Sequence, residues 1–142
     1  MSYLLDTNVL SETVRPRPHP TVLEWLESVP GESLYISSLA LGEIRRGVEG
    51  LALGRRRERL LVWLEHELPD WFGERVLPVD AAVADRWGRL VAEVARPVRA
   101  IDSLLGATAL HHGLRLVTRN GMDFQFPGLV VIDPWETGEE GR

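Results

Sequence analysis

The chain alternates short apolar runs with longer segments whose apolar residues recur at helical spacing, and no other feature of the sequence constrains its fold as strongly. This alternation is typical of βα units, in which parallel strands form one sheet and helices cover its faces. The apolar runs predict strands at 2–6, 33–37, 76–79, 114–118 and 129–132. Pro78 places the third strand at an edge or ends it there, because proline donates no hydrogen bond to a ladder. The sequence therefore predicts an α/β fold with a mostly parallel sheet.

Helical patterns fill the segments between these strands. Pro20 opens one helix, Asp80 caps another, and Gly113 closes the helix that precedes the fourth strand. No internal repeat or linker interrupts the pattern, so we expect one domain over residues 1–136 and a loose tail at 137–142. The predicted helices cover residues 7–14, 20–29, 38–51, 55–68, 81–94 and 100–112, with a stiff proline-rich connector at 15–20.

Composition excludes several function classes. The 142 residues include no cysteine, which excludes a disulfide scaffold, a zinc finger and a thiol nucleophile. All 16 basic residues are arginine, so chemistry that needs a lysine is excluded as well. A net charge of −5 argues against a strongly basic nucleic-acid coat. No apolar run has the length of a membrane span and the first residues lack a basic signal region, so we expect a cytoplasmic protein.

Two carboxylates follow predicted strands directly. Asp6 ends the first strand, and Asp123 lies shortly after the fourth. In open parallel sheets, ligands bind beyond the carboxyl ends of the strands, near the point where the strand order reverses. Each residue also has a structural explanation, since Asp6 can cap the next helix and Asp123 can belong to a turn.

Two further carboxylates lie on predicted helices. Glu43 is flanked on its helical stripe by Ala40 and Gly47, whose small side chains leave the carboxylate room to reach a shared site. Asp102 is the one charged residue between 100 and 110, so we expect a buried carboxylate that needs a partner or a metal. The alternatives are a solvated surface Glu43 and an Asp102 satisfied by the free amides of its helix.

Together the four acids would gather at one rim of the sheet. Crowded like charges raise one another's pKa and destabilise the fold unless a cation neutralises them. Oxygen ligands without His or Cys suit Mg²⁺ or Mn²⁺, which can activate water and stabilise charge on a phosphoryl group. The pattern therefore predicts metal-dependent cleavage of phosphodiesters.

Other motifs carry weaker signals. His111 and His112 are adjacent on a helix and point in different directions, which makes them a poor metal chelate. Residues 47–50 (GVEG) lie inside a helical pattern and are too short to specify a nucleotide clamp. The arginines at 45, 46, 55, 56, 57 and 59 alternate with glutamates, which is typical of a solvated helical face. The tryptophans at 25, 63, 71 and 87 fall in amphipathic helices and are expected in the core or an interface.

At this level of detail the sequence resembles the PIN-domain ribonucleases, specifically the VapC toxin family and its FitB-like branch. The resemblance spans almost the whole chain, with its pieces in order. The matching segments are 4–12 (LLDTNVLSE), 36–38 (ISS), 42–44 (GEI) with Gly47, 102–109 (DSLLGATA), 116–120 (LVTRN), 123–124 (DF) and 133–135 (DPW). Gly106 departs from a more usual Ala, and Asp133 departs from a more usual Asn.

The resemblance implies a three-layer αβα domain with a five-stranded parallel sheet and an acidic pocket that holds Mg²⁺ or Mn²⁺. It implies an endoribonuclease that acts as the toxin of a type II toxin–antitoxin pair, inhibits translation and is neutralised by a VapB-type antitoxin. By the same resemblance, the catalytic and metal-binding acids are Asp6, Glu43, Asp102 and Asp123, and the residues that orient them are Thr7, Asn8, Thr118 and Asn120.

Alternatives remain at this stage. A housekeeping RNA-processing nuclease would carry the same acids without a toxin role, and a PIN-like module could bind RNA or protein without catalysis. A phosphatase with Asp6 as the phosphoryl acceptor is disfavoured, since such sites use a lysine near the phosphate. The helices near 9–29 and 60–71 carry more apolar and Trp surface than a domain of this size readily buries, so we also expect a homodimer.

Overall fold

The computed structural model describes residues 1–136, and the predicted tail at 137–142 lies outside the described residues. Its five-stranded sheet has the strand order β3-β2-β1-β4-β5, and all neighbouring strands pair in parallel. The predicted five-stranded parallel α/β architecture is therefore confirmed. The strands are β1 (Tyr3–Leu5), β2 (Leu34–Ser37), β3 (Val76–Leu77), β4 (Arg115–Val117) and β5 (Val131–Ile132).

The helices begin and end close to the predicted positions because local signals set their ends. The Asp80 carboxylate accepts a hydrogen bond from the amide of Val83 at 2.9 Å, and Gly113 ends its helix in the left-handed conformation at φ 66°. Short helical turns lie at η1 (Gly31–Ser33), η3 (Gly73–Arg75) and η4 (Gly121–Phe124). The α-helices are α1 (Thr7–Glu12), α2 (Pro20–Ser28), α3 (Ser38–Glu49), α4 (Arg55–Val62), α5 (Leu68–Phe72), α6 (Ala81–Val94) and α7 (Ala100–His112).

One predicted helix is interrupted. The segment after Gly54 forms α4, then a π-helical turn at η2 (Trp63–Glu67), and then α5. Pro69 lies in the first turn of α5 and has no amide hydrogen to donate, so the regular α-helical ladder cannot run through it. The wider turn immediately before Pro69 keeps Trp63 and Leu64 facing the core.

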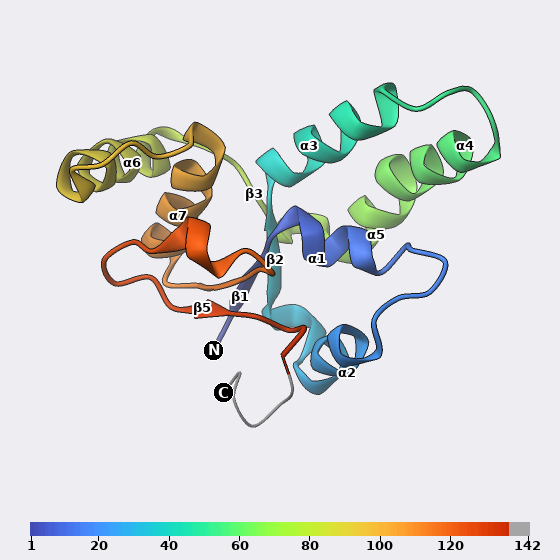
Figure 1. Ribbon diagram of the computed structural model, residues 1–142, viewed down its shortest axis with the longest axis horizontal. Coiled ribbons are helices and arrows are strands. Elements are labelled where there is room, and N and C mark those ends of the chain that lie inside the picture. The colour runs from blue at the N-terminus through green and yellow to red at the C-terminus, as the bar shows by residue number, and fades with distance from the viewer. Residues whose placement is uncertain (137–142) are drawn as a thin grey trace.

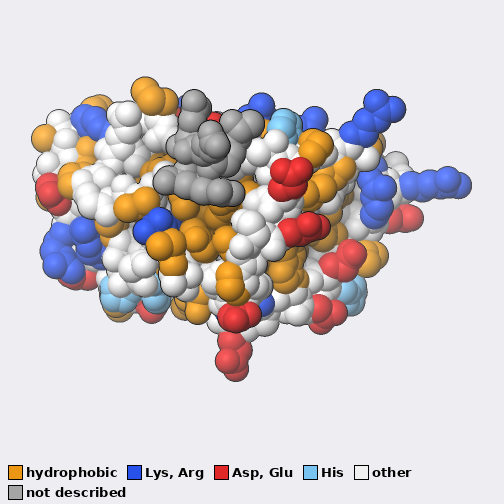
Figure 2. Space-filling view, turned by 90° about the horizontal axis from the view of Figure 1, so that it is seen from below, with side chains coloured by type: hydrophobic (Ala, Val, Ile, Leu, Met, Phe, Trp, Pro, Cys, Tyr) orange, Lys and Arg blue, Asp and Glu red, His pale blue; other side chains and the backbone are white. Residues whose placement is uncertain are grey.

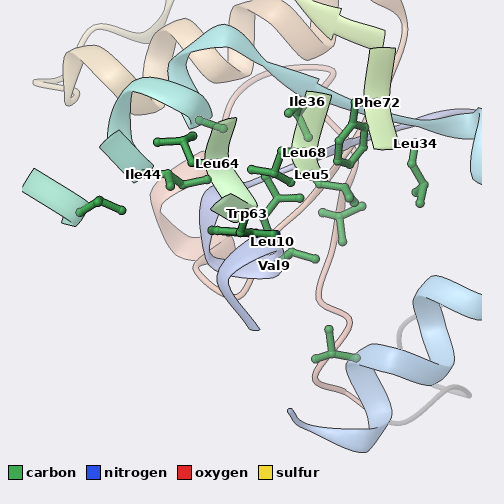
Figure 3. Close-up of a cluster of buried hydrophobic side chains, with 14 of the residues drawn as sticks. Leu5, Val9, Leu10, Leu34, Ile36, Ile44, Trp63, Leu64, Leu68 and Phe72 are labelled. Carbon is green, nitrogen blue, oxygen red and sulfur yellow. The ribbon is translucent and has the colours of Figure 1, made fainter. Parts of the chain in front are cut away.

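The sheet separates two hydrophobic layers, which gives the three-layer arrangement seen in Figure 1, with α6 and α7 on one side and α1 and α3 on the other. Alternate residues of one strand serve the two layers. Leu5 and Val117 belong to the cluster drawn in Figure 3, with Trp63 and Phe72, whereas Leu4 belongs to the layer under α6 and α7. The predicted burial of the tryptophans is confirmed, since all four lie in or against these clusters.

Two arginines hold elements together, and this modifies the prediction that the arginine-rich helix is merely a solvated face. Arg57 donates to the carbonyl oxygens of Val48, Glu49 and Leu51 and so closes the carboxyl end of α3. Arg75 donates to three carbonyl oxygens, those of Gly31, Leu34 and Trp71. These contacts fasten the start of β2 to the end of α5.

The strand order sets the place of a site. From β1 the chain moves to β2 on one side and later returns to β4 on the other, so the order reverses at β1. A crevice is expected beyond the carboxyl ends of β1 and its neighbours, where the connections diverge. On the face seen from below, hydrophobic atoms show between charged groups that lie mainly toward the rim (Figure 2). No helix in the described part of the chain is long and apolar enough to cross a membrane.

Candidate active site

Asp6 lies at the junction of β1 and α1, at the point where the strand order reverses. Its carboxylate caps α1 by accepting a hydrogen bond from the Thr7 amide at 2.8 Å. A cap needs only one of the two oxygens. The other oxygen, Oδ2, accepts hydrogen bonds from the hydroxyl of Thr118 at 2.8 Å and from the side-chain amide nitrogen of Asn8 at 3.4 Å. Asp6 is therefore fixed from both β1 and β4, which capping alone does not require.

The polar residues predicted to orient the acids form a connected network. Asn8 also donates to the Thr118 hydroxyl at 3.3 Å and accepts from the backbone amide of Arg119 at 3.4 Å. Thr118 is fully buried, so its hydroxyl has a fixed place. Asn120 takes part through its backbone, whose N–H donates to the Thr118 hydroxyl at 3.1 Å. The network therefore ties the end of β4 to the Asp6 carboxylate.

Glu43 reaches the same crevice from α3. The Thr7 hydroxyl donates to Glu43 Oε1 at 2.8 Å, while the Thr7 amide donates to Asp6. One residue thus bridges two carboxylates that are 37 positions apart in the sequence. Glu43 is exposed on the first turns beyond β2, and its predicted approach to Asp6 is what the structure shows.

Asp102 and Asp123 come from the other side of the sheet. Asp102 lies in the first turn of α7, and Asp123 lies in η4 after β4. The prediction that Asp102 is buried was wrong: it is half-buried, and its neighbour Ile101 is 40% exposed. The buried residues of α7 lie between Ser103 and Ala109, whereas Ala100 and Ile101 are exposed, so the all-apolar pattern overstated the burial of its start.

Electrostatics place these acids near one another. Burial raises the pKa of Asp6 above its ordinary value, and the charges of Glu43 and Asp123 raise it further. Hydrogen bonds from Thr118 and the Thr7 amide oppose this rise in pKa. Burial likewise raises the pKa of Asp102, with additional contributions from Asp123 and Asp6. Asp6 is therefore within electrostatic range of Glu43 and Asp123, and Asp102 is within range of Asp123 and Asp6, so the four acids are neighbours at this end of the sheet.

The donor set fits a hard divalent cation that keeps part of its water shell. Within residues 1–136, no three Asp, Glu or His side chains converge closely enough to form a complete ligand cage. Mg²⁺ does not need such a cage, because it is commonly bound by one or two carboxylates together with waters and substrate phosphate oxygens. Asp6 and its acidic neighbours provide oxygen donors and unneutralised charge, which is what a cation of this kind requires.

Sequence reasoning missed two features that surround Asp102. Arg99, three residues earlier, lowers the pKa of Asp102 and partly offsets the effect of the other acids. Ser103 is fully buried, accepts a hydrogen bond from the indole of Trp87 at 2.9 Å and contacts the carbonyl oxygens of Arg99 and Ala100. The position of Arg99, three residues before Asp102, could have predicted its effect on the pKa of Asp102. No local sequence pattern could have predicted the contact of Trp87 on α6 with Ser103 on α7.

A hollow of about 670 Å³ lies between α1, α3 and α4 and opens beside Glu43 and Thr7. Its walls are largely apolar and include Ile44 and Trp63. Arginines line it as well, at positions 15, 56 and 59. We call this space the α1–α3–α4 hollow.

Known proteins resemble this chain in sequence and in fold. Residues 3–125 match the family model of the PIN domain, so the chain belongs to the PIN-domain family. It is 35% identical over 135 residues to toxin FitB of Neisseria gonorrhoeae, covering 93% of this chain and 97% of FitB. It is also 35% identical over 136 residues to VapC ribonuclease Y4jK of Sinorhizobium fredii, covering 94% and 97% of the two chains.

Solved structures agree with the sequence similarity. The crystal structure of FitAcB from Neisseria gonorrhoeae superposes with a TM-score of 0.87 at 34% identity, covering 95% of this chain and 99% of that one. Within the PIN-domain family, the chain is thus similar to VapC ribonucleases and to the FitB toxin, as its motifs indicated.

Proposed function

We propose that this protein is an endoribonuclease that hydrolyses RNA phosphodiester bonds with Mg²⁺ or Mn²⁺ and acts as the toxin of a toxin–antitoxin pair. The observation that carries the proposal is the Thr7 bridge between Asp6 and Glu43, beside the charges of Asp102 and Asp123. A binding module has no need to gather charges that raise the pKa of Asp6 and Asp102. A catalytic cation site does need them.

The chain's own residues would fix the geometry of the reaction. Asp6 and Asp102, with Asp123 and Glu43 beside them, would hold the cation, which when bound lowers the pKa of water and neutralises charge on the phosphate. Thr118 and the Thr7 amide keep the Asp6 carboxylate in place without protonating it, since both donate to the ionised form. Thr7 restrains Glu43, which is otherwise exposed, so that its carboxylate stays at the crevice.

Carboxamide substitutions test the catalytic assignment. We expect Asp6→Asn and Asp102→Asn to lose nearly all RNA cleavage in Mg²⁺ or Mn²⁺, and the parent protein to stop cleaving in EDTA. Asp85→Asn is the matched control, because Asp85 is an exposed acid on α6 that pairs with Arg89 on the same helix. The substrate should be total cellular RNA rather than one oligonucleotide, because a selective enzyme can ignore a generic sequence. Undiminished cleavage by Asp102→Asn, or in excess chelator, would contradict the proposal.

The toxin role implies a partner and a place of action. We propose that a VapB-type antitoxin binds across the α1–α3–α4 hollow, where an apolar peptide face would meet Ile44 and Trp63 while its end lies beside Glu43. RNA cleavage that inhibits translation would take place in the cytoplasm. Expression of the chain alone should arrest growth, and co-expression of the antitoxin should restore it. Normal growth on expression of the active enzyme would instead favour a housekeeping nuclease.

Homodimer formation, as in the sequence prediction, belongs to the same proposal. The helices named for it bury more of their apolar surface than the sequence suggested, since Trp25 and Trp71 are half-buried against the core. Val62 remains 52% exposed on α4. Sedimentation of the purified chain should show a dimer at micromolar concentration, and a strict monomer would overturn this part of the proposal.

A further inference from the structure

A second hollow lies on the other flank of α3, between that helix and the start of α7. It has a volume of about 550 Å³, within the range of small-molecule sites. Glu43 lines both this hollow and the α1–α3–α4 hollow, so the two spaces meet at the proposed active site. In Figure 1 the upper end of the sheet lies between α3 and α7, the two helices that contribute residues to this hollow. We call it the Ile101 hollow.

Four of the eight residues that line the Ile101 hollow have aliphatic or proline side chains, and the other four are Ser38, Gly42, Glu43 and Arg46. Leu39 comes from α3, Pro78 and Val79 come from the segment after β3, and Ile101 comes from α7. Ile101 is among the large hydrophobic side chains that the fold leaves exposed, at 40%, and it directly precedes Asp102. Part of the Ile101 side chain is therefore accessible to a ligand beside the Asp102 carboxylate.

One positive charge stands at the rim of the hollow. Arg46 lies one helical turn beyond Glu43 on α3, is exposed, and lines the same space. None of the ion pairs found within residues 1–136 involves Arg46, whereas Arg45 pairs with Glu49 and Glu65. Its guanidinium is therefore available to an anion that approaches the hollow from solvent.

We propose that the Ile101 hollow is the specificity site of the enzyme: it holds the base of an unpaired RNA nucleotide next to the cleaved phosphate, while Arg46 binds a neighbouring phosphate. The inference rests on the proposed ribonuclease function and identifies which part of the substrate selects the cleavage position. Sequence-specific RNA recognition targets unstacked bases, whose faces pack on side chains and whose edges form hydrogen bonds. The apolar side chains of the hollow can cover the face of a base, its polar lining residues can reach an edge, and the exposed Arg46 can bind the phosphate.

A protein partner fits this hollow less well. An apolar peptide would leave Arg46 beside it without a counter-charge, and an acidic peptide would bring further negative charge to Glu43 and Asp102, whose carboxylates already lie near other acids. A single nucleotide avoids both costs, because its phosphate can lie at Arg46 while the uncharged base lies near the acids.

Base and phosphate contacts have different signatures, and this allows the proposal to be tested. Ile101→Ala, assayed on total RNA with mapped cleavage sites, should change the base preference next to the cut and lower kcat/KM on the preferred site about five- to tenfold. Arg46→Gln should weaken cleavage of all sites alike and make the salt dependence of RNA binding less steep by about 0.7 in log–log slope. Val130→Ala and Arg89→Gln are the matched controls, because both residues are exposed and lie outside this hollow.

The outcomes separate this inference from the proposed function. If Asp102→Asn is inactive but Ile101→Ala keeps the parent's cleavage sites and rate, the specificity site is wrong and the nuclease stands. If Ile101→Ala changes the oligomeric state or antitoxin binding and leaves the cleavage preference unchanged, the hollow is a protein interface and the inference is also overturned. If Asp102→Asn still cleaves, the proposed function itself fails. Thermal melts of each variant confirm that activity is compared at equal folded fraction.

Discussion

Gly106 offers a stringent test of how the helix that carries Asp102 is packed. An ideal Cβ built on Gly106 would lie 2.7 Å and 2.9 Å from ring carbons Cδ2 and Cε2 of Phe126, closer than real Cβ contacts allow. Phe126 is 5% exposed, packs edge-to-face with Phe124, and has the Arg96 guanidinium 5.6 Å from its ring centre. The ring therefore has little room to move away. The departure of Gly106 from the family's more usual Ala has a physical reason, since it accommodates Phe126.

The expected magnitude follows from two opposing contributions. Alanine in the interior of a helix stabilises by about 1 kcal/mol relative to glycine. Overpacking a close-packed core costs about 1–3 kcal/mol. Gly106→Ala should therefore change the free energy of unfolding by between about 0 and −2 kcal/mol. Gly88→Ala on α6 is the matched control, because nothing lies within 4 Å of its added Cβ, and it should stabilise by about 1 kcal/mol.

Urea denaturation of both variants measures the difference, which should be about 1–3 kcal/mol in favour of Gly88→Ala. Phe126→Leu in the Gly106→Ala background should recover part of the loss, so the two substitutions should be non-additive. Because Phe126 follows η4, which carries Asp123, RNA cleavage should fall in Gly106→Ala beyond the loss of folded protein. Equal stabilisation by Gly106→Ala and Gly88→Ala would show that the ring moves freely and would refute the reasoning.

Three further predictions concern charge and hydrogen bonding. In the folded protein the pKa of Asp102 lies above its ordinary value of 3.8, so ionisation of Asp102 lowers the stability of the fold at higher pH. Asp102→Asn should therefore raise the melting temperature of the metal-free protein at pH 7, with a gain that shrinks toward pH 4. A gain that does not depend on pH would contradict the raised pKa of Asp102. Arg75→Met should lower the free energy of unfolding, measured by urea titration, by about 2–4 kcal/mol, because three carbonyl oxygens lose their hydrogen-bond donor. A loss below about 1 kcal/mol would show that water takes the place of the guanidinium. Thr7→Val should lower kcat about tenfold with little change in melting temperature, while Thr7→Ser should retain activity, because serine keeps the hydroxyl that donates to Glu43. Equal activity of the two variants would show that the Thr7 hydroxyl has no role in cleavage.

Local signals explain why most element boundaries were predictable. Pro20, Asp80 and Gly113 act through their own backbone geometry or through amides within three residues, so neighbouring sequence is enough to interpret them. The strands were shorter than the apolar runs suggested. Pro78 ended β3 at Leu77, because the strand has a partner on one side alone and cannot recruit a ladder beyond the proline.

The acids of the candidate site were predictable because parallel strands end at one edge of the sheet. Asp6 and Asp123 follow strands β1 and β4, which are neighbours, so their proximity follows from the βα alternation once the sheet forms. The bridge from Thr7 to Glu43 depends on the packing of α1 against α3, and no local pattern encodes it. The same is true of the half-exposed first turn of α7, which periodicity alone predicted as buried.

The sequence by itself thus determined the order of strands and helices along the chain, their caps, and the carboxylates available at the strand ends, since each depends on side-chain type and short-range geometry. Tertiary structure decided which polar groups meet. Arg75 reaches Gly31 across 44 positions, Thr118 reaches Asp6 across 112, and Phe126 fills the space above Gly106. Such contacts depend on how helices pack on the sheet, and packing depends on the shape of all neighbouring side chains at once.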